Sequence, residues 1–155
     1  MRTILVAVAL AVLAVPGLAA DSGDLAKGEK TFGQCRACHG ITAPDGTVIF
    51  KGGVTGPDLY GIVGRKIASE EGFRYGKGIL ELAEKHPDAV WDVHSLTAYV
   101  KNPGDYLKEH TGDAKAKTKM TFRLGKDYEH LMAYLLANSP DAPEQPGEDD
   151  GAPRP

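Results

Sequence analysis

The chain is short of cysteine and has no long apolar run beyond its first residues. Its 155 residues include two cysteines and three methionines, and the formal net charge is −3. Two cysteines cannot form a disulfide framework, and without a later apolar run of about 20 residues we expect no membrane span. The charge also argues against a nucleic-acid partner, because proteins that bind nucleic acids carry an excess of positive charge.

Residues 1–20 resemble a secretory signal peptide. Arg2 gives a positive start, an apolar run extends from Ile4 to Val15, and small residues precede a cleavage site after Ala19 or Ala20. The run is short for a transmembrane helix, although an uncleaved anchor is the alternative. We therefore expect export to the periplasm.

The C-terminal segment, residues 139–155, is acidic and rich in proline. Its acidic residues outnumber its one basic residue, Arg154. Such a composition buries too little apolar surface to fold, so we expect a disordered tail. Residues 21–138 then form one domain, in which acidic and basic residues balance.

Both cysteines lie in one short motif, Cys35-Arg36-Ala37-Cys38-His39. Cys-x-x-Cys-His is the attachment site of a c-type haem. Each thiol can add across a haem vinyl group to form a thioether, and the adjacent imidazole can bind the iron from one face. We expect one haem c per chain, bound covalently through Cys35 and Cys38, with His39 as an iron ligand.

Three other uses of the two cysteines explain less of the motif. A disulfide would leave His39 without a role. A thioredoxin-like redox pair needs a βαβ context, and a structural zinc ion needs four nitrogen or sulfur ligands. The sequence predicts no alternation of strands and helices, and it has no second Cys/His cluster.

Met120 is the best candidate for the second iron ligand. It lies in a polar loop, Thr118-Lys119-Met120-Thr121-Phe122, where an apolar residue has little other reason to be. Met1 belongs to the signal peptide, and Met132 fits the apolar face of a helix. Methionine and histidine together are a known pair of haem iron ligands, so His110 is the less favoured alternative to Met120.

Hydrophobic periodicity predicts a small all-α fold with long loops. We expect helices over residues 24–34, 59–63, 77–85, 92–101 and 126–138. Asp21 or Ser22 would cap the first helix, residues 105–109 would form only a short turn, and no strand is expected. Gly28 in a helix interior indicates that another backbone packs closely there. So small an all-α domain needs a large apolar centre, which a haem would supply.

These features together resemble a class I cytochrome c of the bacterial cytochrome c2 type. The resemblance covers residues 24–138 and implies the class I cytochrome c fold, with helices and loops wrapped around one haem. The matching segments are Gly28 with Phe32, Cys35 to His39, Thr55 to Gly61, Gly64-Arg65, Tyr75, Trp91, Tyr99, Asn102-Pro103, Tyr106 to Lys117 and Thr118 to Phe122.

The resemblance implies roles for residues beside the two iron ligands. The carbonyl of Pro57 accepts a hydrogen bond from His39, which orients the imidazole. The hydroxyl of Tyr99 points toward the sulfur of Met120 and tunes the reduction potential. Ligands on both faces leave no open iron site, which implies outer-sphere electron transfer and argues against the alternative of a haem enzyme or gas sensor.

Other implied roles concern the haem propionates. Tyr75 and Trp91 donate hydrogen bonds to a propionate, and Arg65 supplies positive charge nearby. Plain core packing is the alternative role for these aromatic residues. Asp58 stands where the subgroup usually has asparagine, and its negative charge should lower the reduction potential.

Exposed lysines are expected to form the docking face. The resemblance implies a monomer that accepts electrons from a cytochrome bc complex and passes them to a photosynthetic reaction centre or cytochrome oxidase. Positive charge around the haem edge would steer the protein onto acidic partners. The alternatives are a solvated lysine-rich loop and a redox subunit dedicated to one periplasmic enzyme. The docking candidates are Lys27, Lys30, Lys51, Lys108, Lys115, Lys117, Lys119 and Lys126.

Overall fold

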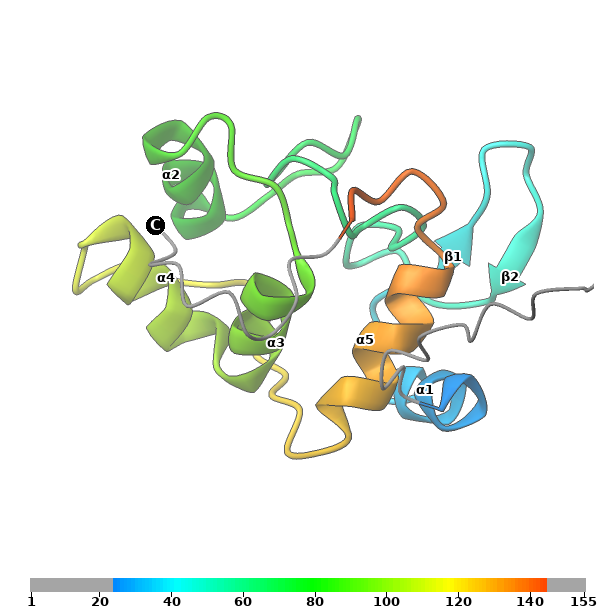
Figure 1. The fold of residues 1–155 in the computed structure, drawn as a ribbon. Helices are drawn as coiled ribbons and strands as arrows, with labels where there is room; N and C mark the ends of the chain where they lie inside the picture. The colour runs from blue at the N-terminus through cyan, green and yellow to red at the C-terminus, as the bar shows by residue number, and fades with distance from the viewer. Residues whose placement is uncertain (1–23, 145–155) are drawn as a thin grey trace, which may run out of the picture.

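The computed structural model describes residues 24–144 and contains five helices and one small sheet within them (Figure 1). In chain order the elements are α1 (Leu25–Phe32), β1 (Ile41–Thr42), β2 (Val48–Phe50), α2 (Lys77–Lys85), α3 (Val93–Lys101), α4 (Pro103–Thr111) and α5 (Tyr128–Ala137). The predicted helix over residues 77–85 is confirmed, and those over 24–34, 92–101 and 126–138 are confirmed with shorter ends. The predicted signal peptide lies outside the described residues.

The first and last helices cross at Gly28. A Cβ atom at this position would lie 2.1 Å from the carbonyl oxygen of His130, so only glycine allows α1 and α5 to approach this closely. The prediction of a close backbone contact is therefore confirmed. The N-cap of α1 is Asp24, whose carboxylate accepts a hydrogen bond from the backbone N–H of Lys27 at 3.1 Å. Asp21 and Ser22, the predicted caps, lie outside the described residues.

Asn102 connects α3 and α4. Its backbone N–H donates to Ala98 O at the end of α3, and its side chain accepts from the backbone N–H of Asp105 at the start of α4. Pro103 follows at the first helical position, where its missing N–H costs nothing. The expectation of a short turn over residues 105–109 was therefore wrong, because Asn102-Pro103 ends one helix and also begins the next.

The described residues contain two short strands where none was predicted. β1 and β2 pair antiparallel with Ile41 opposite Phe50, and a turn closes the hairpin through Gly46, whose N–H donates to Ala43 O at 2.9 Å. Strands of two and three residues are too short to produce an alternating pattern in the sequence. The predicted helix over residues 59–63 is instead a pair of turns.

The packed domain continues past residue 138, where the tail was predicted to begin. Ser139 is 3% exposed, and its hydroxyl accepts from the backbone N–H of Val63 while donating to Leu135 O. Pro143 lies against Gly64. Ser139 thus ties the end of α5 to the loop that carries Arg65, and residues 145–155 lie outside the described range.

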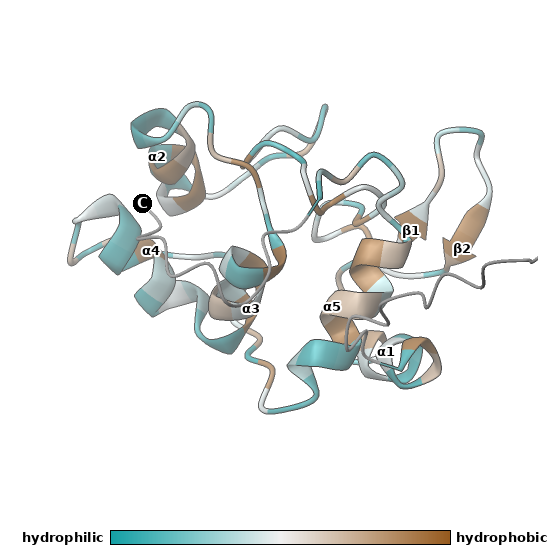
Figure 2. Ribbon diagram, viewed as in Figure 1, coloured by the Kyte–Doolittle hydropathy of each residue, from teal (hydrophilic) through white to brown (hydrophobic). Residues whose placement is uncertain are grey.

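The helices form two groups with the loops between them. α2, α3 and α4 lie at one end of the molecule and α1, α5 and the hairpin at the other (Figure 1). Hydropathy follows this packing, since α5 and both strands are largely hydrophobic whereas α4 is largely hydrophilic (Figure 2). Within residues 24–144, no helix combines the length and the apolar character needed to cross a bilayer.

Candidate haem site

The cysteine motif continues from α1 as a series of tight turns. The N–H of Cys35 donates to Phe32 O at 2.7 Å, and the N–H groups of Cys38 and His39 both donate to Cys35 O. These turns bring both thiols and the imidazole to one cavity. The thiols are unpaired, and burial raises the pKa of Cys35 to about 11, with the Cys38 thiol adding to the shift.

The imidazole of His39 is fixed by a backbone carbonyl. Its Nδ1 lies 2.7 Å from Pro57 O, and because a carbonyl only accepts, Nδ1 carries the proton and donates. The other ring nitrogen, Nε2, is then unprotonated and able to bind a metal. Burial lowers the pKa of His39, an effect that Arg65 reinforces and that the Pro57 bond and Asp58 oppose. The ring is therefore held neutral, as a metal ligand must be.

Met120 is held by the hydroxyl of Thr118. Thr118 Oγ1 accepts from the backbone N–H of Met120 at 3.0 Å and donates to its carbonyl at 3.3 Å. The hydroxyl of Tyr99 lies 3.3 Å from the same Thr118 oxygen. Lys119 fixes the loop from its other side by donating to Arg74 O. The hydroxyl of Tyr99 therefore contacts the residue that holds Met120, and its predicted direction toward the Met120 sulfur stays a prediction.

Nearly all of the predicted cofactor residues line one cavity of about 320 Å³. The thiols and His39 line it together with Met120, and its remaining wall is mostly apolar. A large, flat, apolar cofactor attached through thiols fits this set of residues, and His39 and Met120 offer a nitrogen and a sulfur that could hold its metal. The predicted residues that line the cavity are Cys35, Cys38, His39, Pro57, Tyr75, Trp91, Tyr99 and Met120.

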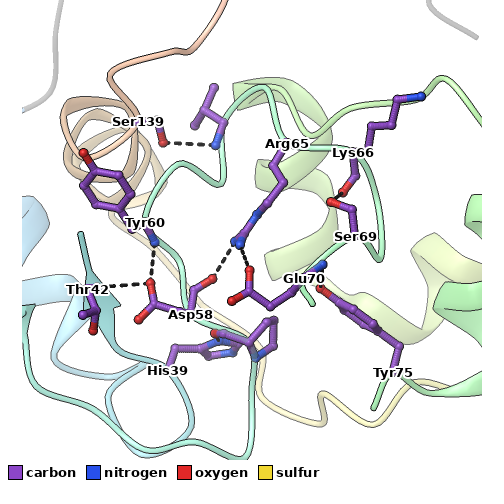
Figure 3. A network of polar contacts seen from close by, with 12 residues as sticks. His39, Thr42, Asp58, Tyr60, Arg65, Lys66, Ser69, Glu70, Tyr75 and Ser139 are labelled. Atoms are coloured by element: carbon purple, nitrogen blue, oxygen red, sulfur yellow. Dashed lines mark hydrogen bonds and ion pairs between the residues drawn. The ribbon is translucent and has the colours of Figure 1, made fainter. Parts of the chain in front are cut away.

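Arg65 is the one predicted cofactor residue outside the lining. Its guanidinium forms an ion pair with Glu70 and donates to Asp58 O at 2.5 Å (Figure 3). The backbone N–H of Glu70 in turn donates to the hydroxyl of Tyr75, which does line the cavity. Arg65 therefore reaches the cavity wall only through Glu70, and its charge is already paired with the Glu70 carboxylate.

The aromatic side chains pack on one another as well as on the cavity. The ring centroid of Tyr99 lies 5.0 Å from that of Trp91 and 5.5 Å from that of Tyr106. Burial raises the pKa of Tyr99, so its phenol stays protonated at neutral pH. Core packing, the alternative role for these aromatics, is thus present alongside their place in the cavity wall.

Comparison with known proteins assigns the chain to a family. A cytochrome c-550 of Paracoccus pantotrophus is 62% identical over 131 residues, which are 83% of this chain and 98% of that protein. A cytochrome c2 of Rhodobacter capsulatus is 48% identical over 130 residues, 84% of this chain and 91% of that protein. The chain is a class I cytochrome c of the c2 and c-550 family.

The fold agrees with this assignment. The X-ray structure of cytochrome c2 from Paracoccus denitrificans matches with a TM-score of 0.76 at 62% identity, over 77% of this chain and 99% of that one. No protein-family profile matches the chain. The cytochrome carries one haem c, bound covalently through Cys35 and Cys38, and it is an electron-transfer protein and not an enzyme.

The rival ligand, His110, lies away from the cavity of the cytochrome. Its ring stacks on Tyr106 with centroids 3.9 Å apart, and its Nδ1 lies 2.9 Å from Tyr106 O. Among the described histidines only His39 lines the cavity, and residues 24–144 hold no cluster of three or more His, Cys, Asp or Glu side chains suited to a metal ion. This geometry leaves Met120 as the candidate opposite His39.

The eight predicted docking lysines are all exposed. Lys117 and Lys119 lie at the mouth of the haem cavity, and Lys51 lines an open groove beside it. Lys27 and Lys108 form ion pairs with acidic residues of their own helices or caps. The structure thus brings three of the eight to the cavity and its neighbouring groove.

Two residues of the site, Thr118 and Glu70, had no role predicted from the sequence. A threonine two residues before Met120 is a recognisable signal, because threonine hydroxyls often bond to the backbone two residues on. Glu70 gave no such signal, since its partner Arg65 is brought to it only by the path of an irregular loop.

Proposed function

We propose that this cytochrome is a periplasmic shuttle that carries single electrons from a cytochrome bc complex to a photosynthetic reaction centre or cytochrome oxidase. Residues 1–20 would act as the signal peptide for export, and residues 21–138, extended to the segment packed around Ser139, would form the haem domain. The acidic tail beyond it would be dispensable for electron transfer. The haem, when bound, supplies the one-electron redox chemistry.

The observation that carries this proposal is the presence of His39 and Met120 in one apolar cavity with both thiols. We propose these two side chains as the axial iron ligands. With a haem bound, a neutral imidazole on one face and a thioether on the other would leave no position for a substrate, and the thioether would favour the reduced iron. A carrier needs this arrangement, whereas a haem enzyme needs an open position.

The surrounding residues have the task of keeping both ligands in place. Pro57 holds the His39 ring, and Thr118 with Tyr99 holds the Met120 loop. Tyr75 and Trp91, which line the same cavity, are proposed as donors to a haem propionate. A rigid ligand set changes little between oxidation states, which is what fast electron transfer requires.

The test of ligation is Met120→Leu, a change that keeps volume and removes the sulfur. We expect the oxidised protein to lose the weak red absorption band that sulfur-to-iron ligation produces. At a fixed ambient potential, the reduced-to-oxidised ratio should fall about tenfold or more. Met132→Leu is the matched control, because Met132 is 2% exposed in the core of α5. If Met120→Leu leaves both the band and the ratio unchanged, the shuttle hypothesis is contradicted.

The proposed docking face is tested by removing one charge at a time. Lys117→Gln, at the mouth of the cavity, should slow electron transfer from a cytochrome bc complex at low salt, and the effect should shrink as salt is added. Lys66→Gln removes the same charge from an exposed residue that pairs with Asp88 instead. Equal effects of the two changes would show that only net charge matters.

A second candidate is a redox subunit dedicated to one periplasmic enzyme. One observation favours it: Val48 and Val54, which are 58% and 89% exposed, flank the same open groove beside the haem loop. Exposed aliphatic side chains that line one groove are typical of a stable contact. Val54→Ser should weaken a permanent complex strongly, whereas it should change the turnover of a transient carrier only slightly.

A further inference from the structure

The ion pair between Arg65 and Glu70 differs from the other ion pairs of the described residues in its burial. The two side chains are 17% and 29% exposed, whereas every other pair has at least one partner more than 45% exposed. Charges that are shielded from water interact over longer distances and are screened less by salt. This pair is therefore placed to influence a nearby redox centre.

The surroundings of the pair connect it to the haem cavity from two directions. Arg65 also donates to Asp58 O at 2.5 Å, next to Pro57, the residue that holds His39 (Figure 3). On the other side, the backbone N–H of Glu70 donates to Tyr75, which lines the cavity. The pair thus lies against the cavity wall on the His39 side.

The two charges have opposite effects on a redox centre. A positive charge beside the cavity favours the reduced state, because reduction adds an electron, and a negative charge opposes it. An unpaired Arg65 would stabilise both the reduced state and an anionic propionate. Glu70 offsets this charge and, by holding one arm of the guanidinium, leaves the other directed at Asp58 O.

We propose that Glu70 is a positioning residue that lowers the reduction potential of this cytochrome by neutralising and orienting Arg65. The proposal rests on the haem and ligands of the proposed function, and it goes beyond them by assigning part of the potential to one carboxylate outside the cavity. The neighbouring Glu71 is exposed and has no such partner among the described residues, so it provides a matched charge control.

The experiment is potentiometric titration of the intact holoprotein and its variants. Glu70→Gln should raise the reduced-to-oxidised ratio at the wild-type midpoint about threefold, or about 28 mV at 59 mV per tenfold for one electron. The shift should persist at high salt. Glu70→Asp, which keeps the charge, should stay nearer to wild type, and Glu71→Gln should move the ratio much less.

Two results would overturn the proposal. Equal shifts in Glu70→Gln and Glu71→Gln would show that only net charge acts, and a lower melting temperature without any change in midpoint would show a purely structural role. The red absorption band separates this outcome from failure of the proposed function. If the band is present and the midpoint is unmoved, Glu70 alone is excluded; if wild type lacks the band, the ligation itself is wrong.

Discussion

The two sides of the haem cavity are held by different kinds of interaction. On the first side, His39 belongs to the covalent attachment motif and its ring donates a hydrogen bond to a backbone carbonyl. The same ring packs directly against the backbone of Gly56, which has no side chain. On the Met120 side the ligand sits in a loop with no regular structure, held by hydrogen bonds from Thr118 and Lys119. The first side is thus restrained mostly by covalent geometry and packing, and the second by a few polar contacts.

This difference predicts that the His39 side is most sensitive to substitutions that add a steric clash. A Cβ atom at Gly56 would lie 2.4 Å from a ring carbon of His39, with no flexible chain end to move aside. Gly56→Ala should therefore displace the imidazole or the loop and lower the free energy of unfolding by about 3 kcal/mol, the upper end of overpacking costs. Denaturant unfolding of the holoprotein measures this.

Gly125→Ala is the control for that substitution, because a Cβ atom there would meet nothing within 4 Å. We expect it to leave the free energy of unfolding within about 0.5 kcal/mol of wild type. Similar losses in both variants would contradict the steric explanation.

The Met120 side should fail through the loss of one hydroxyl. Thr118→Val keeps the shape of the side chain but leaves the backbone N–H of Met120 without its acceptor and Tyr99 without its partner. The expected cost is about 1 to 2 kcal/mol. It should appear as easier displacement of the sulfur by added imidazole, followed through the red absorption band.

Thr121→Val controls for the loss of a loop hydroxyl, since Thr121 is exposed and makes no side-chain hydrogen bond within the described residues. If imidazole displaces the sulfur equally well in Thr118→Val and in wild type, the Met120 loop is held by packing after all, and the contrast between the two sides disappears.

A smaller effect is expected from the charge of Asp58. Its carboxylate accepts from the N–H groups of Tyr60 and Thr42 at 2.8 and 3.1 Å, and its negative charge raises the pKa of His39 against the stronger lowering by burial. Asp58→Asn keeps an acceptor oxygen and removes the charge. The reduced-to-oxidised ratio at the wild-type midpoint should rise by about twofold, because a partly exposed charge is screened. A fall in that ratio would show that the carboxylate acts through its hydrogen bonds.

The same contrast explains how much of the site could be predicted from sequence. The motif at residues 35–39 fixes three site residues by covalent spacing, and the Met120 loop stands out because a methionine lies among polar residues. The ion pair of Arg65 with Glu70 could not be found in this way, because it depends on the course of an irregular loop. Contacts marked by a motif, a glycine or the family resemblance were predictable even when distant in sequence, as for Gly28 and for His39 with Pro57, whereas the Arg65–Glu70 pair carried no such mark.

The fold follows the same rule. α2 was predicted with its observed bounds because its apolar positions repeat at helical spacing. α4 was not predicted because Asn102 and Pro103, its N-cap and first helical residue, are equally typical of the end of a helix. The hairpin was missed because its strands are shorter than the pattern that identifies a strand.

The smallest effect is expected on α4 itself, at His110. Because this ring stacks on Tyr106 and does not line the cavity, His110→Gln should leave the absorption spectrum and the midpoint unchanged. Loss of the stacking contact should cost only about 1 kcal/mol of unfolding free energy. A spectral change in this variant would mean that His110 reaches the iron in the folded protein, and the Met120 side would then not be held as described. An unchanged spectrum in His110→Gln, together with loss of the sulfur band in Met120→Leu, would identify Met120 as the ligand opposite His39.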